Sequence, residues 1–337
     1  MRKVFFIVLL VSLCCVSCKL TPTRLVGKAQ GTYYSIVYYD ARHRNLQPQV
    51  DSLLAAFDLV ASLWVDSSEL CQFNRCADSM EVSECMADLF EKSMSISALT
   101  DGAFDCRVAP LVSAYGFARS NRRDLTQQDI DSLMVLCQSP VWLSKGSDGR
   151  KVLHKANAAS RLDFNAIAQG YSVDLLCDML QAYGIGSFIV DVGGEVRSAG
   201  AKPDGTPWSV GVERPAEDRE DAREVDVAIP LVDCSIVTSG SYRKYYEKDG
   251  MRFSHTIDPA TGRPVSHTTL SASVIDDKAW RADALATAFM VMGYERATAW
   301  LAAHSDIDKV YFIYDDNGEN ARRATPAFQR LIDDFDE

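Results

Sequence analysis

The 337-residue sequence has little positive charge and lacks the clustered basic residues of nucleic-acid-binding proteins. It contains 35 Lys and Arg against 46 Asp and Glu, which gives a formal net charge of −11. Proteins that bind nucleic acids concentrate Lys and Arg on one face or in one stripe. No such stripe is present, so we do not expect a nucleic-acid partner.

Several common sequence signatures are also missing. There is neither a G-x-G-x-x-G fingerprint nor a P-loop with its Lys, so the usual nucleotide-binding folds are not indicated. Beyond the N-terminal segment, no C-x-x-C pair marks a zinc site. Internal repeats, low-complexity tracts and Pro- or Ser-rich linkers are absent, so we expect one compact domain over residues 31–337.

No apolar run is long enough to cross a bilayer, but a short one lies at the N-terminus. Arg2 and Lys3 precede about ten apolar residues, 4–13, and the segment ends at Cys18 after a small residue. This pattern resembles a bacterial lipobox. It predicts a lipoprotein signal over residues 1–17, lipidation of Cys18 and a tether over residues 18–30. An ordinary cleaved signal peptide is the alternative, and both predict export.

Removing residues 1–17 takes away the two early positive charges and two of the ten cysteines. With Cys18 lipidated, seven cysteines remain: Cys71, Cys76, Cys85, Cys106, Cys137, Cys177 and Cys234. An odd, scattered set is not a disulfide framework. We expect most of them to be small buried hydrophobic residues, although bridging of Cys71 with Cys76 or Cys85 stays open in an oxidising compartment.

Hydrophobic periodicity predicts a mixture of helices and strands, and therefore an α+β fold. Helices are expected over residues 50–63, 83–100, 126–137, 167–183, 282–292 (ended by Gly293) and 294–303. Strands are expected over residues 32–39, 139–143, 151–154, 187–192, 208–212, 225–230, 236–238, 251–257, 270–275 and 309–314.

Two segments about twenty residues apart carry the strongest chemical signal. Residues 255–264 place His255 beside an Asp-Pro/Thr-Gly turn, and residues 281–287 place Asp283 and Thr287 at i and i+4 on one helical face. Hard oxygen ligands of this kind suit Mg²⁺ together with waters and substrate phosphates. Taken singly, a helix-dipole charge at Asp283 and a core histidine at 255 are the plainer interpretations.

Three further motifs are weaker signals. The glycine pair Gly193-Gly194 follows an apolar strand, and residues 238–240 form a Thr-Ser-Gly segment, so both could present backbone amides to an anion. Asp163 precedes a predicted helix and is an N-cap candidate. Each has an ordinary turn or cap as its alternative interpretation.

Taken in order, these motifs resemble those of the ApbE family of flavin transferases over residues 28–315. The other matching segments are Gly31-Thr32, residues 62–74, residues 101–105 and residues 163–174. The resemblance implies an ApbE-like, T-fold-related α+β fold with packed helices around a central FAD cleft. It implies Mg²⁺ held by the side chains of Asp283 and Thr287 and the carbonyl of Ala166. The implied FAD contacts are Gln30, Trp64, Ala103, Phe104, Asp105, Asp163, Gln169 and Ile257.

The implied activity is that of an FAD:protein FMN transferase, which moves FMN from FAD to a Ser or Thr hydroxyl of a target protein and releases AMP. His255 is the best candidate for the general base. The implied acceptor is a redox-pump subunit or an extracytoplasmic reductase. The enzyme itself is expected to be exported and anchored to a membrane. Trp64 and Gln169 depart from the family, where Tyr and a charged residue are common. An FAD pyrophosphatase and a non-catalytic flavin-binding lipoprotein are the alternatives.

Overall fold

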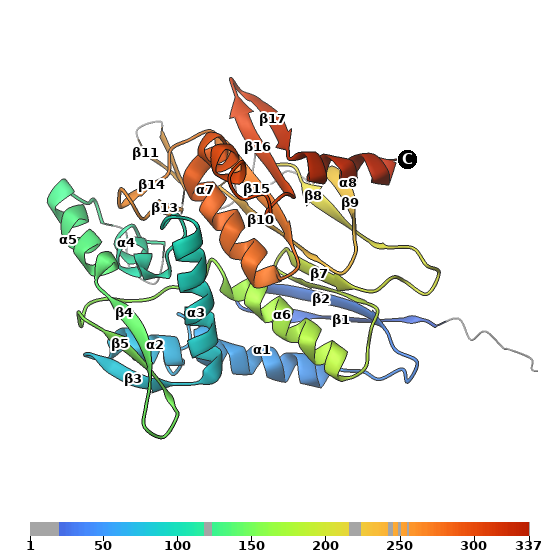
Figure 1. The fold of residues 1–337 in the computed structure, drawn as a ribbon, viewed down its shortest axis with the longest axis horizontal. Helices are drawn as coiled ribbons and strands as arrows, with labels where there is room; N and C mark the ends of the chain where they lie inside the picture. The colour runs from blue at the N-terminus through green and yellow to red at the C-terminus, as the bar shows by residue number, and fades with distance from the viewer. Residues whose placement is uncertain are drawn as a thin grey trace, which may run out of the picture.

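A single antiparallel sheet of eight strands forms the centre of the computed structural model, which describes residues 20–117, 123–215, 224–241, 245–248, 251–254 and 256–336 (Figure 1). The strand order is β1-β2-β6-β7-β10-β15-β16-β17. The bounds are β1 Pro22–Ala29, β2 Thr32–Tyr39, β6 Phe188–Val192, β7 Glu195–Ala199, β10 Ser235–Gly240, β15 Thr269–Asp276, β16 Val310–Asp316 and β17 Glu319–Ala324. The expected α+β class is confirmed.

The first hairpin takes up most of the predicted tether, residues 18–30. Residues 22–29 form β1, the edge strand paired with β2 along its whole length. The turn contains only Gln30 and Gly31, with φ of 53° and 73°. Two left-handed residues in a two-residue loop form the type I′ turn, whose twist matches that of paired strands. Alternation in β1 is weak, with Gly27 and charged residues on the open edge, so the sequence does not predict this strand.

Helices α1 (Gln47–Ala61), α6 (Ala168–Ala182) and α7 (Ala279–Leu301) lie together on one side of the sheet (Figure 1). The apolar face of α1 packs on β1 and β2, and those of α6 and α7 pack on the inward residues of β6, β7, β10 and β15. The predicted helix end at Gly293 is confirmed, because its φ of 74° and ψ of 162° are not helical and α7 consists of two helical segments that meet there at a kink. The imidazole of His267 lies against Gly293.

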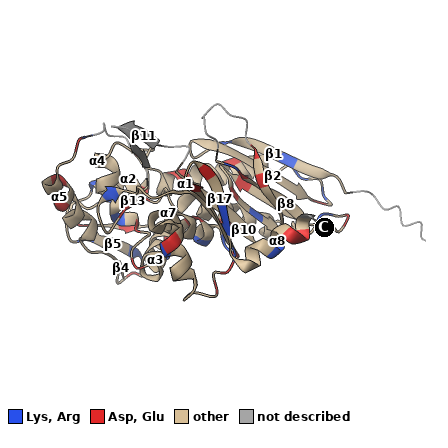
Figure 2. Ribbon diagram, turned by 90° about the horizontal axis from the view of Figure 1, so that it is seen from above, with Lys and Arg blue, Asp and Glu red and all other residues tan. Residues whose placement is uncertain are grey.

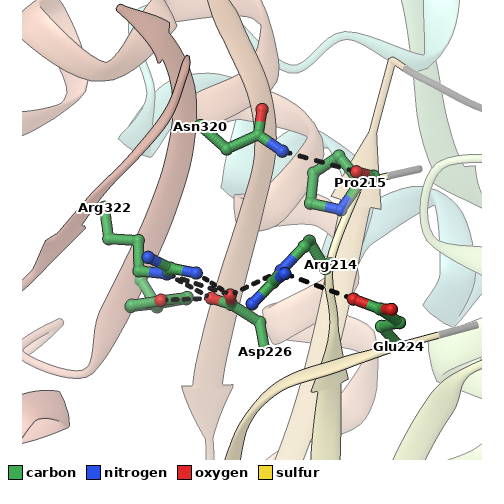
Figure 3. Close-up of polar contacts among 7 residues, drawn as sticks. Arg214, Pro215, Glu224, Asp226, Asn320 and Arg322 are labelled. Atoms are coloured by element: carbon green, nitrogen blue, oxygen red, sulfur yellow. Dashed lines mark hydrogen bonds and ion pairs between the residues drawn. The ribbon is translucent and has the colours of Figure 1, made fainter. Parts of the chain in front are cut away.

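The opposite face of the sheet is covered by the hairpin β8–β9 (Trp208–Glu213 and Val225–Leu231) and the helix α8 (Pro326–Asp336). Asp226 of β9 joins this layer to the sheet, as Figure 3 shows. Its carboxylate accepts hydrogen bonds from Arg322 (Nε, 2.9 Å) and Tyr311 (Oη, 2.6 Å), and Arg214 is also an ion-pair partner. Burial acts to raise the pKa of Asp226, but these donors outweigh it and hold the pKa below its ordinary value.

Residues between α1 and α6 form a lobe beside α7 (Figure 2). Its helices are α2 Glu69–Arg75, α3 Glu84–Leu99, the 3₁₀ turn Cys106–Val108, α4 Ala109–Ala114 and α5 Gln127–Gln138, and its strands are β3 Ser79–Val82, β4 Val141–Lys145 and β5 Lys151–Lys155. Two short hairpins, β11–β12 (Tyr245–Lys248, Met251–Ser254) and β13–β14 (Ile257–Asp258, Arg263–Pro264), precede β15.

None of the helices in the described ranges is long and apolar enough to cross a membrane. The seven cysteines from Cys71 to Cys234 are free thiols. Residues 1–17 and Cys18, which carry the predicted signal and lipidation, lie outside the described residues.

Candidate functional site

The site is built where α6 and α7 cross. The two backbones come so close at Gly170 that a Cβ atom there would lie 2.3 Å from the Ala279 carbonyl oxygen and 2.8 Å from the Asp283 Cβ. Only glycine allows this approach. The Gly170 amide donates a hydrogen bond to Asp283 Oδ2 at 3.0 Å, so the carboxylate of one helix meets the N-terminal turn of the other.

Asp283 is only 4% exposed, and burial raises its pKa to about 7, against the smaller lowering effect of the Gly170 hydrogen bond. A carboxyl in this state is costly to ionise without a positive partner. The predicted helix-dipole interpretation is therefore insufficient, because Asp283 is directed to a different helix. The carboxyl has the environment in which a bound cation would stabilise the charged form.

Two more candidate oxygen ligands come from the residue before the N-cap of α6 and from α7 itself. At the start of α6 the Ala168 amide donates to the Phe164 carbonyl (2.8 Å) and the Tyr171 amide donates to the Ile167 carbonyl (3.0 Å), and Ala166 lies between these two acceptors. Since Gly170 donates to Asp283, the Ala166 carbonyl lacks its usual helical partner. One turn along α7, Thr287 Oγ1 lies 3.2 Å from Ser239 Oγ of β10. The sequence identified the Thr-Ser-Gly segment but not Ser239 as a neighbour of Thr287.

A second set of predicted residues meets at the start of α6. The side chain of Gln169 lies against Gly193, where a Cβ atom would be 2.6 Å from Gln169 Nε2 and 2.8 Å from a methyl of Thr32. Gln30, in the adjacent turn, has a buried Nε2 with no hydrogen-bond partner among the described residues. A hollow of about 580 Å³ is lined by residues 28–33. An unsatisfied donor beside a glycine pair is an arrangement that suits a polar ligand.

Asp163 lies in a segment whose backbone is hydrogen-bonded to two other parts of the chain. It is not the N-cap of α6, which is Ile167. Its amide donates to the Cys106 carbonyl (2.8 Å), and its carboxylate accepts from the Asn165 amide (2.8 Å). Asn74 of α2 bonds both backbone groups of Leu162, each at 2.8 Å. Burial raises the pKa of Asp163.

A buried lysine, which no sequence pattern indicated, supports the same segment. Lys155 is 3% exposed, and its Nζ donates to the carbonyls of Phe73 (3.1 Å) and Ser160 (3.2 Å). It thereby joins the end of α2 to the chain leading into Asp163. Burial lowers the pKa of Lys155.

The remaining predicted contacts are more dispersed. Asp105 is bound by Arg107 (2.7 Å) and lies next to the Cys106 carbonyl that holds Asp163, whereas Ala103 and Phe104 are buried core residues. Ile257 is buried beside Tyr115. Trp64 is 60% exposed, so much of its ring surface faces solvent. His255 lies outside the described residues.

The donor set around Asp283 fits Mg²⁺ in kind. One carboxylate, one hydroxyl and one carbonyl are hard oxygen ligands, and Mg²⁺ keeps several waters and binds substrate phosphates. In the described part of the chain, no group of three or more His, Cys, Asp and Glu gathers as a transition-metal site would require.

Comparisons with known proteins find relatives of this chain. The profile of the ApbE family matches residues 30–311. The chain is 35% identical over 302 residues to an FAD:protein FMN transferase of Vibrio cholerae, covering 87% of this chain and 88% of that protein. It is 36% identical over 282 residues to the protein of the same name in Escherichia coli, covering 82% and 80%.

Solved structures are also similar. The apo form of the Pseudomonas stutzeri flavinyl transferase ApbE superposes with a TM-score of 0.81 at 32% identity, covering 93% of this chain and 97% of that one. The apbe protein of Thermotoga maritima gives a TM-score of 0.80 at 25% identity, covering 93% and 99%.

Proposed function

Because the chain belongs to the ApbE family, we propose that it transfers the FMN part of FAD to a Ser or Thr hydroxyl of an acceptor protein, with Mg²⁺ required and AMP released. It is an enzyme of the FAD:protein FMN transferase class, the name carried by its relatives at 35–36% identity over more than four-fifths of the chain. The observation that supports the finer proposal is the buried carboxylate of Asp283, held at the crossing of α6 and α7 one helical turn before Thr287.

The proposed reaction is a displacement at the FMN-side phosphorus of FAD. The acceptor oxygen forms a new P–O bond, the bond to the AMP oxygen breaks, and AMP leaves with the bonding electrons. The hydroxyl proton passes to a base, for which His255 is our candidate, since an imidazole can accept a proton near neutral pH. The product is an FMN phosphoester on the acceptor.

The side chains of Asp283 and Thr287 and the Ala166 carbonyl would hold Mg²⁺. When bound, the ion would offset negative charge on the pyrophosphate and orient it for in-line attack. Gly170 contributes by orienting the carboxylate of Asp283 through its amide. Ser239, 3.2 Å from Thr287, would fix the direction of that hydroxyl.

We propose that FAD lies between the Gln30 turn, the Gln169–Gly193 contact and the Asp163 segment. The buried Nε2 of Gln30 and the amide of Gln169 are uncharged donors for polar groups of the ligand. Trp64, being exposed, could stack on a ring of FAD. Since Gln169 is neutral, the positive charge near the pyrophosphate would come mainly from the metal.

For localisation, we propose an exported lipoprotein anchored through Cys18, which acts on acceptors at the same membrane surface. The basis is the short apolar run and the residues that precede Cys18. Replacement of Cys18 by Ser should release the protein into the soluble fraction; continued membrane association of that variant would contradict the anchor.

The experiment that tests the activity is mass spectrometry of a candidate acceptor after incubation with the protein, FAD and Mg²⁺. We expect a mass gain equal to FMN minus water that disappears in EDTA. The variant Asp283→Ala should keep the fold by circular dichroism and lose transfer; full transfer by this variant would overturn the metal assignment. FMN and AMP without an adduct would favour FAD hydrolysis, and FAD binding without turnover would favour a flavin-binding protein.

A further inference from the structure

A second buried carboxylate, Asp174, lies one turn after Gly170 on α6. Its Oδ2 accepts a hydrogen bond from the Trp280 amide of α7 at 3.0 Å. Its Oδ1 forms an ion pair with Arg197 of β7. The side chains of Asp174 and Arg197 are 9% and 12% exposed, so the pair is largely removed from solvent.

Asp174 and Asp283 make reciprocal contacts. Asp283 of α7 accepts from Gly170, the third residue of α6, and Asp174 of α6 accepts from Trp280, the second residue of α7. These are the positions at which an N-cap side chain normally accepts a hydrogen bond. Neither helix has such a bond from its own N-cap, Ile167 or Lys278. Each helix therefore has its N-terminus capped by the other.

The two contacts fix how α7 sits on α6. Two hydrogen bonds, separated by one helical turn on each helix, limit both sliding along the axis and rotation about it. The contact at Gly170 sets the separation of the helices at the same place. Arg197 then ties the pair to the sheet, because it comes from β7 and bonds the carboxylate of Asp174.

We propose that Asp174, held by Arg197, is a positioning residue for the Mg²⁺ site. It holds the first turn of α7 so that Asp283, three residues after Trp280, and Thr287, one turn further, face the Ala166 carbonyl. Asp174 is not among the proposed metal ligands or FAD contacts, and it acts through its bond to the first turn of α7. This inference rests on the proposed function, since it concerns the same site.

The plainer interpretation is that the Asp174–Arg197 pair only stabilises the fold. A matched control separates the two, because Asp226 is also a buried carboxylate bonded by arginine, in the layer on the opposite face of the sheet (Figure 3). Asp174→Asn and Asp226→Asn each remove one buried charge and keep the side-chain shape. Both should lower thermal stability, but only the first should disturb the metal.

The test is calorimetric titration of Mg²⁺ into the full-length wild type and both variants, with the Mg²⁺ dependence of FMN transfer measured in parallel. Loss of a residue that orients metal ligands typically weakens metal binding about 10- to 100-fold. We expect the Kd for Mg²⁺, and the Mg²⁺ concentration for half-maximal transfer, to rise by that factor in Asp174→Asn. In Asp226→Asn both should stay within about twofold of wild type.

Wild-type Mg²⁺ affinity in a folded Asp174→Asn protein would overturn the positioning role and leave the proposed function intact. If wild type itself bound no Mg²⁺, the metal site and this inference would both be wrong. If Asp174→Asn does not fold, Arg197→Gln provides the second variant. It keeps the hydrogen bond to Trp280 and removes the tie to β7, and it should weaken Mg²⁺ binding in the same direction; unchanged affinity there would also overturn the inference.

Discussion

Replacement of Asp283 by Asn should stabilise the metal-free protein while it abolishes transfer. Burial raises the pKa of Asp283 from 3.8 to about 7, so at pH 8 the fold holds an ionised carboxylate in a place that disfavours charge. Asn has the same shape and can still accept the hydrogen bond from Gly170. It removes only the cost of burying the charge.

The size of the effect follows from the two pKa values. Each pH unit of difference corresponds to about 1.4 kcal/mol, so the ionised carboxylate costs roughly 4 kcal/mol at pH 8 and roughly 2 kcal/mol at pH 5. Because the pKa of Asp283 is higher in the folded state than in the unfolded state, the folded protein binds more protons between these two values. The free energy of unfolding therefore falls as pH rises from about 4 to 7. At about 2 °C per kcal/mol, Asp283→Asn should raise Tm by up to about 8 °C at pH 8.

The assay is thermal unfolding of wild type and Asp283→Asn in EDTA between pH 5 and 8, repeated with Mg²⁺. The gap between the two proteins should widen as pH rises, and Mg²⁺ should raise the Tm of wild type alone, because a ligand stabilises only the state that binds it. A variant less stable than wild type at pH 8 in EDTA would refute the claim that burial penalises this carboxylate.

Three further variants test the packing around the site. Gly170→Ala should cost about 1–3 kcal/mol in urea unfolding, despite its better helix propensity, because the new methyl meets the Ala279 carbonyl; equal stability would contradict the close approach. Lys155→Met should cost about 2–4 kcal/mol by leaving buried carbonyls without donors, and wild-type stability would show that water replaces them. Burial lowers the pKa of His267, whose Nε2 bonds the Met290 carbonyl at the kink of α7, so stability should be lost as pH falls below about 6.5; His267→Gln should show less of this loss.

The sequence predicts well those helices and strands that bury one distinctly apolar face. The helix α6 and the strand β2 match their predicted ranges to within a residue, because apolar periodicity is strong in both. The placement of Asp283 and Thr287 on one face of α7 is also confirmed. By contrast β1, an edge strand with an open side, has no strong alternation and was missed.

Contacts between distant segments were beyond prediction from one sequence. Nothing local indicates that Gly170 approaches Ala279, or that Asp174 bonds Trp280, since these pairs are more than a hundred residues apart. Gly170 within a predicted helix was the available signal, because glycine there costs stability unless a close approach needs it. Lys155 had no signal, since its buried position depends on carbonyls from two other segments.

The early start of β1 bears on the proposed lipid anchor, because it leaves little chain between Cys18 and the sheet. If Cys18 carries the lipid, only residues 19–21 separate it from Pro22, and four chain steps extend to ~14 Å at most. The eight residues of β1 add ~27 Å before the Gln30 turn. The Gln30 turn would therefore lie no more than about 40 Å from the lipidated residue. Under this proposal, an acceptor hydroxyl would have to come within about that distance of the bilayer surface to receive FMN.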